Sequence, residues 1–214
     1  MGYGNEALAR ILVIAAHPQL EHSRATRALM EAAARLPAGH VEVRDLYALY
    51  PDYLIDVATE QQRLAEAELL VWLHPVHWYS MPPLLKLWLD EVFAFGWAYG
   101  PGGRALEGKA LWLAVSTGGP ESSYRPDGYN RYFFDAFLHP CEQTAALTRL
   151  RWLPPLVLHG AHRASEAEIA AHAALFAGRL AAWPSVAGWP ELAEGDERPD
   201  CEVPADARPA VDEA

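Results

Sequence analysis

The feature that most constrains the fold is a set of short runs that are apolar throughout. Residues 11–15, 69–74 and 110–116 read ILVIA, LLVWLH and ALWLAVS. A strand with one solvated face alternates apolar and polar residues, whereas a strand buried on both faces is apolar along its length. These runs therefore predict strands at the centre of a parallel sheet that helices cover on both sides.

The segments between these runs show helical spacing of apolar residues. We expect helices over residues 24–36, 56–66, 84–95, 129–138, 141–152 and 166–183, and further strands over 41–45 and 156–159. Ser23 and Ser165 stand as N-caps, and Pro82 and Pro83 suit a first helical turn. Five strands alternating with helices indicate an α/β fold with a five-stranded parallel sheet.

Length and charge divide the chain into a body and a tail. The 214 residues are 51% hydrophobic, which suits one compact domain over residues 1–183. The net charge is -11, and the last 30 residues hold nine acidic against two basic residues, a net -7. Residues 184–214 are also rich in proline, so we expect an acidic tail that is disordered or loosely attached.

Composition also excludes several classes of function. The body has no cluster of lysine and arginine, which argues against a nucleic-acid partner. Cys141 and Cys201 stand in different contexts and do not indicate a disulfide framework. No signal peptide or membrane span can be read, so we expect a cytoplasmic protein.

The loop after the first strand suits a phosphate. In an open parallel sheet, ligands bind outside the carboxyl ends of the strands. His17 ends the first strand, and Ser23, Arg24, Ala25 and Thr26 lead into a helix whose N-terminus attracts anions. The loop has no glycine-rich dinucleotide fingerprint, which favours a mononucleotide. The alternative is that Ser23 and Thr26 only cap the helix and that His17 is an ordinary strand-end histidine.

The loop after the third strand suits a flat aromatic ring. Pro75, Val76, His77, Trp78 and Tyr79 lie between prolines, outside any helical core stripe, and could form the walls and polar contacts of a flavin site. The alternative is that both aromatic residues pack back onto the sheet. His74 and His77 do not predict a metal site, because no third ligand follows at a suitable spacing.

The loop after the fourth strand allows the backbone to approach a ligand closely. It reads Thr117, Gly118, Gly119 and Pro120, and its N–H groups could hold the pyrimidine edge of a flavin. Taken alone, this segment could be a plain turn. The three loops share one sheet edge, and together they favour FMN in preference to FAD.

These residues resemble a known family, the NAD(P)H:quinone reductase branch of flavodoxin-like proteins. Within that branch the chain is similar to the ancillary subunits of glutathione-regulated potassium-efflux systems. The resemblance spans about residues 10 to 183 and is carried by three stretches: 16–26, 74–100 (HPVHWYSMPPLLKLWLDEVFAFGWAYG) and 116–119.

The resemblance implies a flavodoxin-like three-layer sandwich and a homodimer with FMN at each of two interface sites. It implies hydride transfer from NADH or NADPH to a quinone. His17 and residues 23–26 would then hold the phosphate and ribityl chain, residues 76–79 the ring, and residues 117–120 its polar edge. It also implies a second role, as a regulatory subunit on the cytoplasmic face of a potassium-efflux antiporter. The mildly acidic body disfavours a flavodoxin-type electron carrier.

One departure concerns the residues beyond the two glycines. Mammalian-type quinone reductases have a tyrosine and a histidine here that assist hydride transfer. Counting from Gly119 puts Tyr124 in the tyrosine place and Asn130 in the histidine place. Tyr124 or Tyr129 could donate a hydrogen bond to a quinone oxygen, and the alternative is that both are bystanders in the loop.

Overall fold

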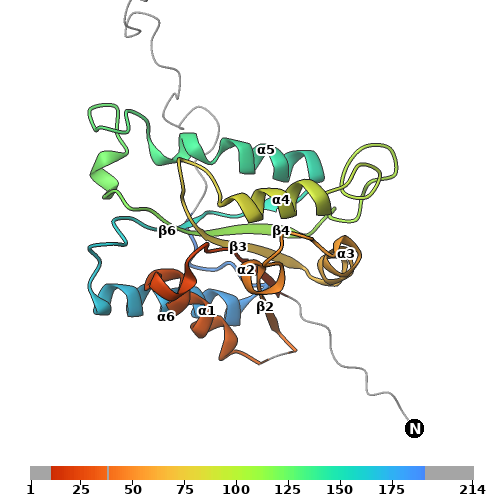
Figure 1. Ribbon diagram of the computed structural model, residues 1–214, viewed down its shortest axis with the longest axis horizontal. Coiled ribbons are helices and arrows are strands. Elements are labelled where there is room, and N and C mark those ends of the chain that lie inside the picture. Colours follow the sequence, from red (N-terminus) through yellow and green to blue (C-terminus); the bar gives the residue numbers. More distant parts are fainter. Residues whose placement is uncertain (1–10, 38, 191–214) are drawn as a thin grey trace, which may run out of the picture.

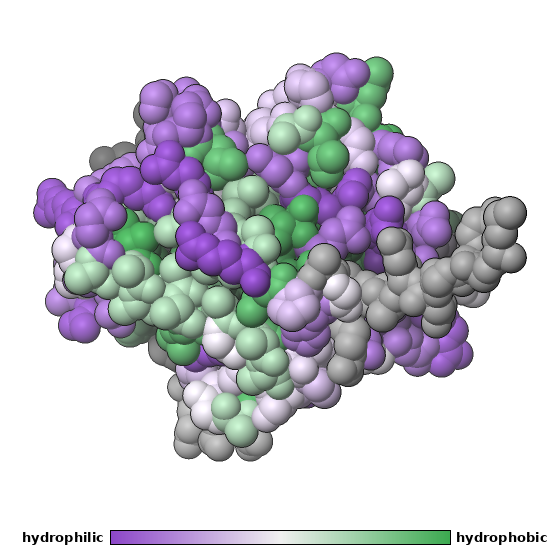
Figure 2. Space-filling model, turned by 90° about the horizontal axis from the view of Figure 1, so that it is seen from below, coloured by the Kyte–Doolittle hydropathy of each residue, from purple (hydrophilic) through white to green (hydrophobic). Residues whose placement is uncertain are grey.

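The protein is a three-layer α/β sandwich, seen in a computed structural model that describes residues 11–37 and 39–190. Helices α4 and α5 cover one face of the sheet, and α1 and α6 cover the other (Figure 1). Seen from the α1 and α6 side, apolar residues lie in the middle of the face and hydrophilic residues surround them (Figure 2). This arrangement confirms the predicted fold.

The sheet is parallel and has the strand order β2-β1-β3-β4-β5, with β6 also paired to β4. The strands are β1 (Ile11–Ala15), β2 (Val41–Asp45), β3 (Leu69–Pro75), β4 (Ala110–Ser116), β5 (Arg151–Trp152) and β6 (Leu156–Leu158). β6 is the predicted fifth strand, and β5 is an additional two-residue strand where the sequence predicted the end of a helix; the two pair with successive stretches of β4. The strand order reverses at β1, and ligands bind at such a switch point in open α/β sheets.

Six α-helices and three 3-10 helices connect the described strands. The helices are α1 (Ala25–Ala34), α2 (Leu46–Leu49), α3 (Val57–Glu66), α4 (Pro83–Val92), α5 (His139–Thr148) and α6 (Glu166–Ala182). The 3-10 helices are η1 (Leu20–His22), η2 (Glu121–Ser123) and η3 (Phe134–Phe137). Ser165 caps α6 in a capping box with Glu168, as its position before the helix predicts.

The core consists of two clusters, one on each face of the sheet. Alternate residues of a strand point to opposite faces, so Leu12 and Ile14 join one cluster while Ile11 and Val13 join the other. The first cluster includes Trp88 of α4, and the second includes Phe176 of α6. Burial on both faces explains why the central strands carry no polar residue until their carboxyl ends.

Two helix predictions differ from the structure. Residues 129–138 were expected to be helical, but only η3 forms there, because the aromatic residues of this segment pack on one another and on Tyr124. Helix α5 was expected to reach Trp152 but ends at Thr148. Arg149 adopts a left-handed conformation (φ 60°) as its C-cap, and the chain then turns into β5.

The segment after α6 returns to the sheet. Trp189 lies with its ring centroid 4.6 Å from that of Trp112, and the Arg179 guanidinium lies 4.9 Å from the Trp189 ring. The expected boundary at residue 183 therefore precedes a short segment that contacts the second core cluster. The rest of the expected tail, residues 191–214, lies outside the described residues.

A buried carboxylate in α3 forms hydrogen bonds with residues of β2 and α4. Glu60 is fully buried and accepts hydrogen bonds from Arg44, from the Tyr50 hydroxyl (2.5 Å) and from Trp88 Nε1 (2.9 Å). Arg44 also contacts Glu42 at 3.1 Å. Buried charges are stable only when they are paired and hydrogen-bonded, and both partners here meet that condition.

Candidate functional site

A cavity of about 640 Å³ opens at the carboxyl ends of β1, β3, β4 and β6. The loops after β3, β4 and β6 reach this end of the sheet (Figure 1). Of the predicted site residues, the cavity brings together His17, Ser23, Arg24, Ala25, Pro75, Val76, His77, Thr117 and Gly118. Its lining does not include Thr26, Trp78, Tyr79, Gly119, Pro120 or Tyr124.

The start of α1 forms one end of the cavity. Ser23 Oγ accepts a hydrogen bond from Thr26 N at 3.1 Å, as a cap does. The first N–H groups of a helix have no partner within it, and the helix dipole adds positive potential there. The Arg24 guanidinium is paired with Glu166 of α6 at 2.7 Å. Thr26 is buried and lines a small separate hollow instead.

His17 is held in one orientation at the wall of the cavity. Its Nδ1 accepts a hydrogen bond from Gln19 N at 3.1 Å, so in the neutral ring Nε2 carries the proton and can donate. Burial lowers the pKa of His17, and the nearby His77 lowers it further. The two rings lie 6.2 Å apart between centroids. Near neutral pH, His17 is therefore an uncharged donor.

The loop after β3 is a strained turn that exposes an indole. His77 and Ser80 exchange two backbone hydrogen bonds of 2.9 and 3.0 Å, and the two residues between them have positive φ angles of 48° (Trp78) and 63° (Tyr79). Residues other than glycine rarely adopt positive φ angles, and such backbone strain is concentrated at functional sites. The turn leaves Trp78 91% exposed, whereas Tyr79 stacks on Phe137 with a centroid distance of 4.9 Å.

A side chain would collide at Gly119 and would fit only tightly at Gly118. A Cβ at Gly118 would lie 3.2 Å from the His162 ring, and one at Gly119 would lie 2.6 Å from the Tyr129 hydroxyl. Thr117 is buried, and its Oγ1 donates to Gly119 O at 2.8 Å. The backbone at this turn is thus fixed beside the cavity.

Tyr124 and Asn130 lie behind the turn. Tyr124 is buried, and burial raises the pKa of its hydroxyl while a hydrogen bond to Thr117 opposes this. Asn130 accepts a hydrogen bond from the Tyr79 hydroxyl at 3.3 Å and donates one to Ser123 Oγ at 3.1 Å. Asn130 therefore joins the loops after β3 and β4.

The cavity also has lining residues that sequence reasoning missed. These are Pro18, Gln19, His22, Pro83, Ser116, Ala161 and His162. Ala161 and His162 follow β6, and Ala161 N donates to Thr117 O at 2.8 Å, which brings this loop against the loop after β4. The rule that ligands bind at strand ends could have pointed to the β6 loop, but no residue type in it signalled a ligand.

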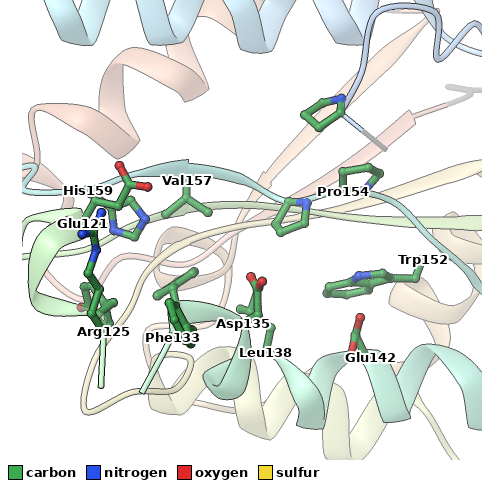
Figure 3. Close-up of a pocket in the computed structure, with 14 residues that line it drawn as sticks. Glu121, Arg125, Phe133, Asp135, Leu138, Glu142, Trp152, Pro154, Val157 and His159 are labelled. Atoms are coloured by element: carbon green, nitrogen blue, oxygen red, sulfur yellow. The ribbon is translucent and has the colours of Figure 1, made fainter. Parts of the chain in front are cut away.

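A second cavity of about 470 Å³ lies between the β5–β6 edge and the α5 layer (Figure 3). Trp152 and Glu142 lie toward one end, and His159 and Glu121 lie together at the other. His159 Nδ1 is 3.1 Å from Thr117 Oγ1, so it contacts a residue that lines the first cavity.

Within the described ranges, no group of three or more histidine, cysteine or acidic residues is placed to hold a metal ion. None of the described helices has the length and apolar character needed to cross a bilayer. Cys141 is buried, which raises the pKa of its thiol to about 11, and Cys201 lies outside the described residues.

Comparison with known proteins identifies the family. A family model with the description "Flavodoxin-like fold" matches residues 9–180. The chain belongs to this flavodoxin-like family. Among its curated relatives is the glutathione-regulated potassium-efflux system ancillary protein KefF of Citrobacter koseri. It is 49% identical over 173 residues, which cover 81% of this chain and 96% of that protein.

Solved structures to which the chain is similar carry different names. General stress protein 14 of Treponema denticola, in complex with FMN, is 39% identical, covers 81% of this chain and 98% of its own, and has a TM-score of 0.76. A thermophilic tryptophan halogenase from Streptomycin violaceusniger is 42% identical, with coverages of 77% and 95% and a TM-score of 0.74. An NADPH-quinone reductase from P. pentosaceus is 26% identical, with coverages of 80% and 97% and a TM-score of 0.72. Because these proteins are named for different activities, the geometry of the first cavity is also needed to assign an activity to this chain.

Proposed function

We propose that the protein is an FMN-dependent NAD(P)H:quinone oxidoreductase, which moves two electrons as hydride from NADH or NADPH to a quinone. One observation carries the proposal: residues from the predicted loops after β1, β3 and β4 line a single cavity at the strand ends. The volume of about 640 Å³ lies within the usual range for cofactor sites. Similarity to the FMN complex and to the quinone reductase supports the same reading.

The residues present fit FMN. The first turn of α1 and Ser23 would hold the phosphate, with the Nε2–H of His17 as a further donor. Pro75, Val76 and His77 would lie along the ring, and the backbone at Thr117 and Gly118 would meet its polar edge. Trp78 and Tyr79, at the rim, would cover the ring or the substrate.

Bound FMN would supply the hydride chemistry that links NAD(P)H to the quinone. The reaction consumes one NAD(P)H, one proton and one quinone, and it forms NAD(P)+ and a hydroquinone. The protein's own residues bind, orient and exclude water. Tyr124, which was predicted from sequence to donate toward the quinone, is buried and lines the second cavity, not the first, so it would act on the first cavity only through its hydrogen bond with Thr117.

An absorbance spectrum with FMN, followed by anaerobic titration with NADH and then NADPH, tests this proposal. We expect a flavin spectrum that bleaches with one or both donors and returns when a quinone is added. A colourless protein after incubation with FMN contradicts the proposal. Rapid NAD(P)H oxidation with a quinone and no partner protein excludes the electron-carrier alternative.

Similarity to KefF favours a second role, as an ancillary regulator of a potassium-efflux antiporter. In this role the protein would be cytoplasmic and would dock at the inner face of the membrane through its partner. Co-purification with such an antiporter tests the docking. The Trp78→Ala variant separates the two roles, because this side chain is 91% exposed and its loss leaves the core intact. If the variant loses reductase activity and still activates transport, catalysis is not the means of regulation.

We propose that the protein is a homodimer. Large side chains near the first cavity, Trp78 and Tyr79 among them, are exposed in the single chain, and Phe95 is also exposed. Exposed apolar surface of this kind marks interaction sites. Light scattering after size-exclusion chromatography gives the molar mass. A mass equal to one chain at micromolar concentration contradicts the proposal.

A further inference from the structure

Two histidines with unpartnered nitrogens line a small hollow between the sheet and the layer of α1 and α6 (Figure 1). His74 ends β3 next to Pro75 and is only 3% exposed, and His172 lies in α6. The Nε2 atoms of both rings are buried, and among the described residues neither has a hydrogen-bond partner. The hollow has a volume of about 10 Å³.

The tautomer of His74 follows from its other nitrogen. His74 Nδ1 lies 3.0 Å from the carbonyl oxygen of Pro75. A carbonyl oxygen can only accept a hydrogen bond, so Nδ1 carries the proton. Burial lowers the pKa of His74 to about 4, so the ring is neutral near pH 7 and Nε2 is an acceptor. A buried acceptor without a partner costs free energy that a hydrogen bond would recover.

The lining of the hollow favours a small neutral occupant. No acidic residue or cysteine is among the described residues that line it, and two histidines are fewer ligands than a structural metal site uses. Burial and the nearby Arg179 lower the pKa of His172, so neither ring is charged near pH 7. Thr26 and Ser116 add hydroxyl groups, and the remaining lining residues are apolar: Ala25, Leu29, Leu73, Ala114, Val115 and Leu158.

We propose that the hollow binds one water molecule, which donates a hydrogen bond to His74 Nε2 and is also hydrogen-bonded to His172 Nε2. A hollow of about 10–15 Å³ is large enough for one water molecule, which needs about two to four polar partners. The two imidazoles supply two partners, and Thr26 and Ser116 can supply the others. One water thus satisfies both unpartnered nitrogens.

This water links α6 to the wall of the first cavity. It joins His172 to His74, whose Nδ1–H holds the carbonyl group of Pro75, and Pro75 lines the first cavity. Ala25 and Ser116 line both the hollow and the first cavity. The water belongs to the protein itself, so its presence does not depend on the proposed reductase activity.

A crystal structure of the wild-type protein, at a resolution that shows ordered water, is the first test. We expect one density peak within about 3.2 Å of the Nε2 atoms of both His74 and His172. An empty hollow, a peak that reaches only one of the two nitrogens, or the anomalous signal of a metal ion overturns the proposal.

NMR of the 15N-labelled imidazoles near pH 7.5 tests the same site in solution. His74 should carry its proton on Nδ1, and its Nε2 signal should lie upfield of a free lone pair, as for a nitrogen that accepts a hydrogen bond. The His74→Leu variant assigns the signal. A proton on Nε2, or the signal of a free lone pair, contradicts the proposal.

The substitution Ala114→Val distinguishes a hollow that holds water from an empty one. Ala114 lies in β4 and lines the hollow, so the added methyl groups would take the place of the water. Because the histidine nitrogens then lose their partner, we expect the equilibrium constant for unfolding to rise by about 5-fold or more. The Nε2 signal of His74 should move to the position of a free lone pair. In an empty hollow the methyl groups would fill space and stabilise the protein, and an unfolding constant below that of the wild type overturns the proposal.

Ala110→Val is the matched control. Ala110 lies in the same strand and the same core cluster as Ala114, is 2% exposed and does not line the hollow. Ala110→Val should leave the Nε2 signal of His74 unchanged. If it moves that signal as far as Ala114→Val does, the change comes from general repacking of the core and the proposal is wrong.

Discussion

The substitution Glu60→Ala tests whether the buried ion pair stabilises the fold. Glu60 is fully buried in α3, where its carboxylate accepts hydrogen bonds from Arg44, Tyr50 and Trp88. The substitution removes the acceptor of three donors at once. It leaves the Arg44 guanidinium, whose side chain is only 12% exposed, without its main partner.

The size of the effect follows from what remains. Removing one partner of a buried ion pair costs about 3–5 kcal/mol, because the other charge stays buried. Arg44 keeps Glu42 at 3.1 Å, so we expect the lower end of this range, about 3 kcal/mol. For a protein of this length the midpoint of thermal unfolding should fall by about 6–12 °C. Urea unfolding followed by tryptophan fluorescence measures the free energy of unfolding.

Asp90→Ala is the matched control. Asp90 forms an ion pair with Lys86 on the surface of α4, and the two side chains are 55% and 56% exposed. Exposed pairs of this kind contribute less than about 1 kcal/mol. If Glu60→Ala costs no more than Asp90→Ala, the buried pair does not stabilise the protein and the reasoning is wrong.

Two further predictions concern Ser23 and His74. Ser23→Ala should weaken FMN binding by about 5-fold or more, as loss of about 1 kcal/mol of a cap or phosphate contact implies. Fluorescence titration measures this, and Ser165→Ala, which removes the cap of α6 at a residue that does not line the cavity, should change the affinity less. Burial lowers the pKa of His74 to about 4, below the 6.5 of an unfolded histidine. His74 therefore lowers the free energy of unfolding as the pH falls from 6.5 to 4, by about 3 kcal/mol in all. Between pH 7 and pH 4, the free energy of unfolding should fall less for His74→Leu than for the wild type.

The central strands could be predicted because burial on both faces leaves a direct mark on sequence. β1, β3 and β4 consist of apolar residues with hardly a polar interruption, and their predicted bounds agree with the structure within one residue. The β2 strand was also found, although only one face of it is well covered. Where two faces are buried, composition alone is enough.

The conformation of residues 129–138 could not be predicted because its order comes from contacts across the chain. Tyr124 packs against His159, and Tyr79 stacks on Phe137, so aromatic residues with helical spacing are used in tertiary packing instead. The end of α5 was missed for a similar reason, since Arg149 fills a left-handed position that glycine usually marks.

The lining of the first cavity shows the same division. The sequence pointed to Ser23 and Gly118, which line it, because caps and close backbone approaches require particular residue types. His162 and Ala161 were missed, since they reach the cavity only through the register of β6 with β4. The contact between His159 and Thr117 depends on the same register.

The division of the outer strand into β5 and β6 has a consequence for association with other chains. Of this outer strand, β5 contributes two residues and β6 three, and Pro154 and Pro155 stand between them. Prolines have no N–H to donate, and short interrupted edges give another strand little to pair with. This edge of the sheet is therefore protected against the strand pairing between chains that leads to aggregation. The carboxyl ends of the strands, where the first cavity lies, remain accessible to a ligand.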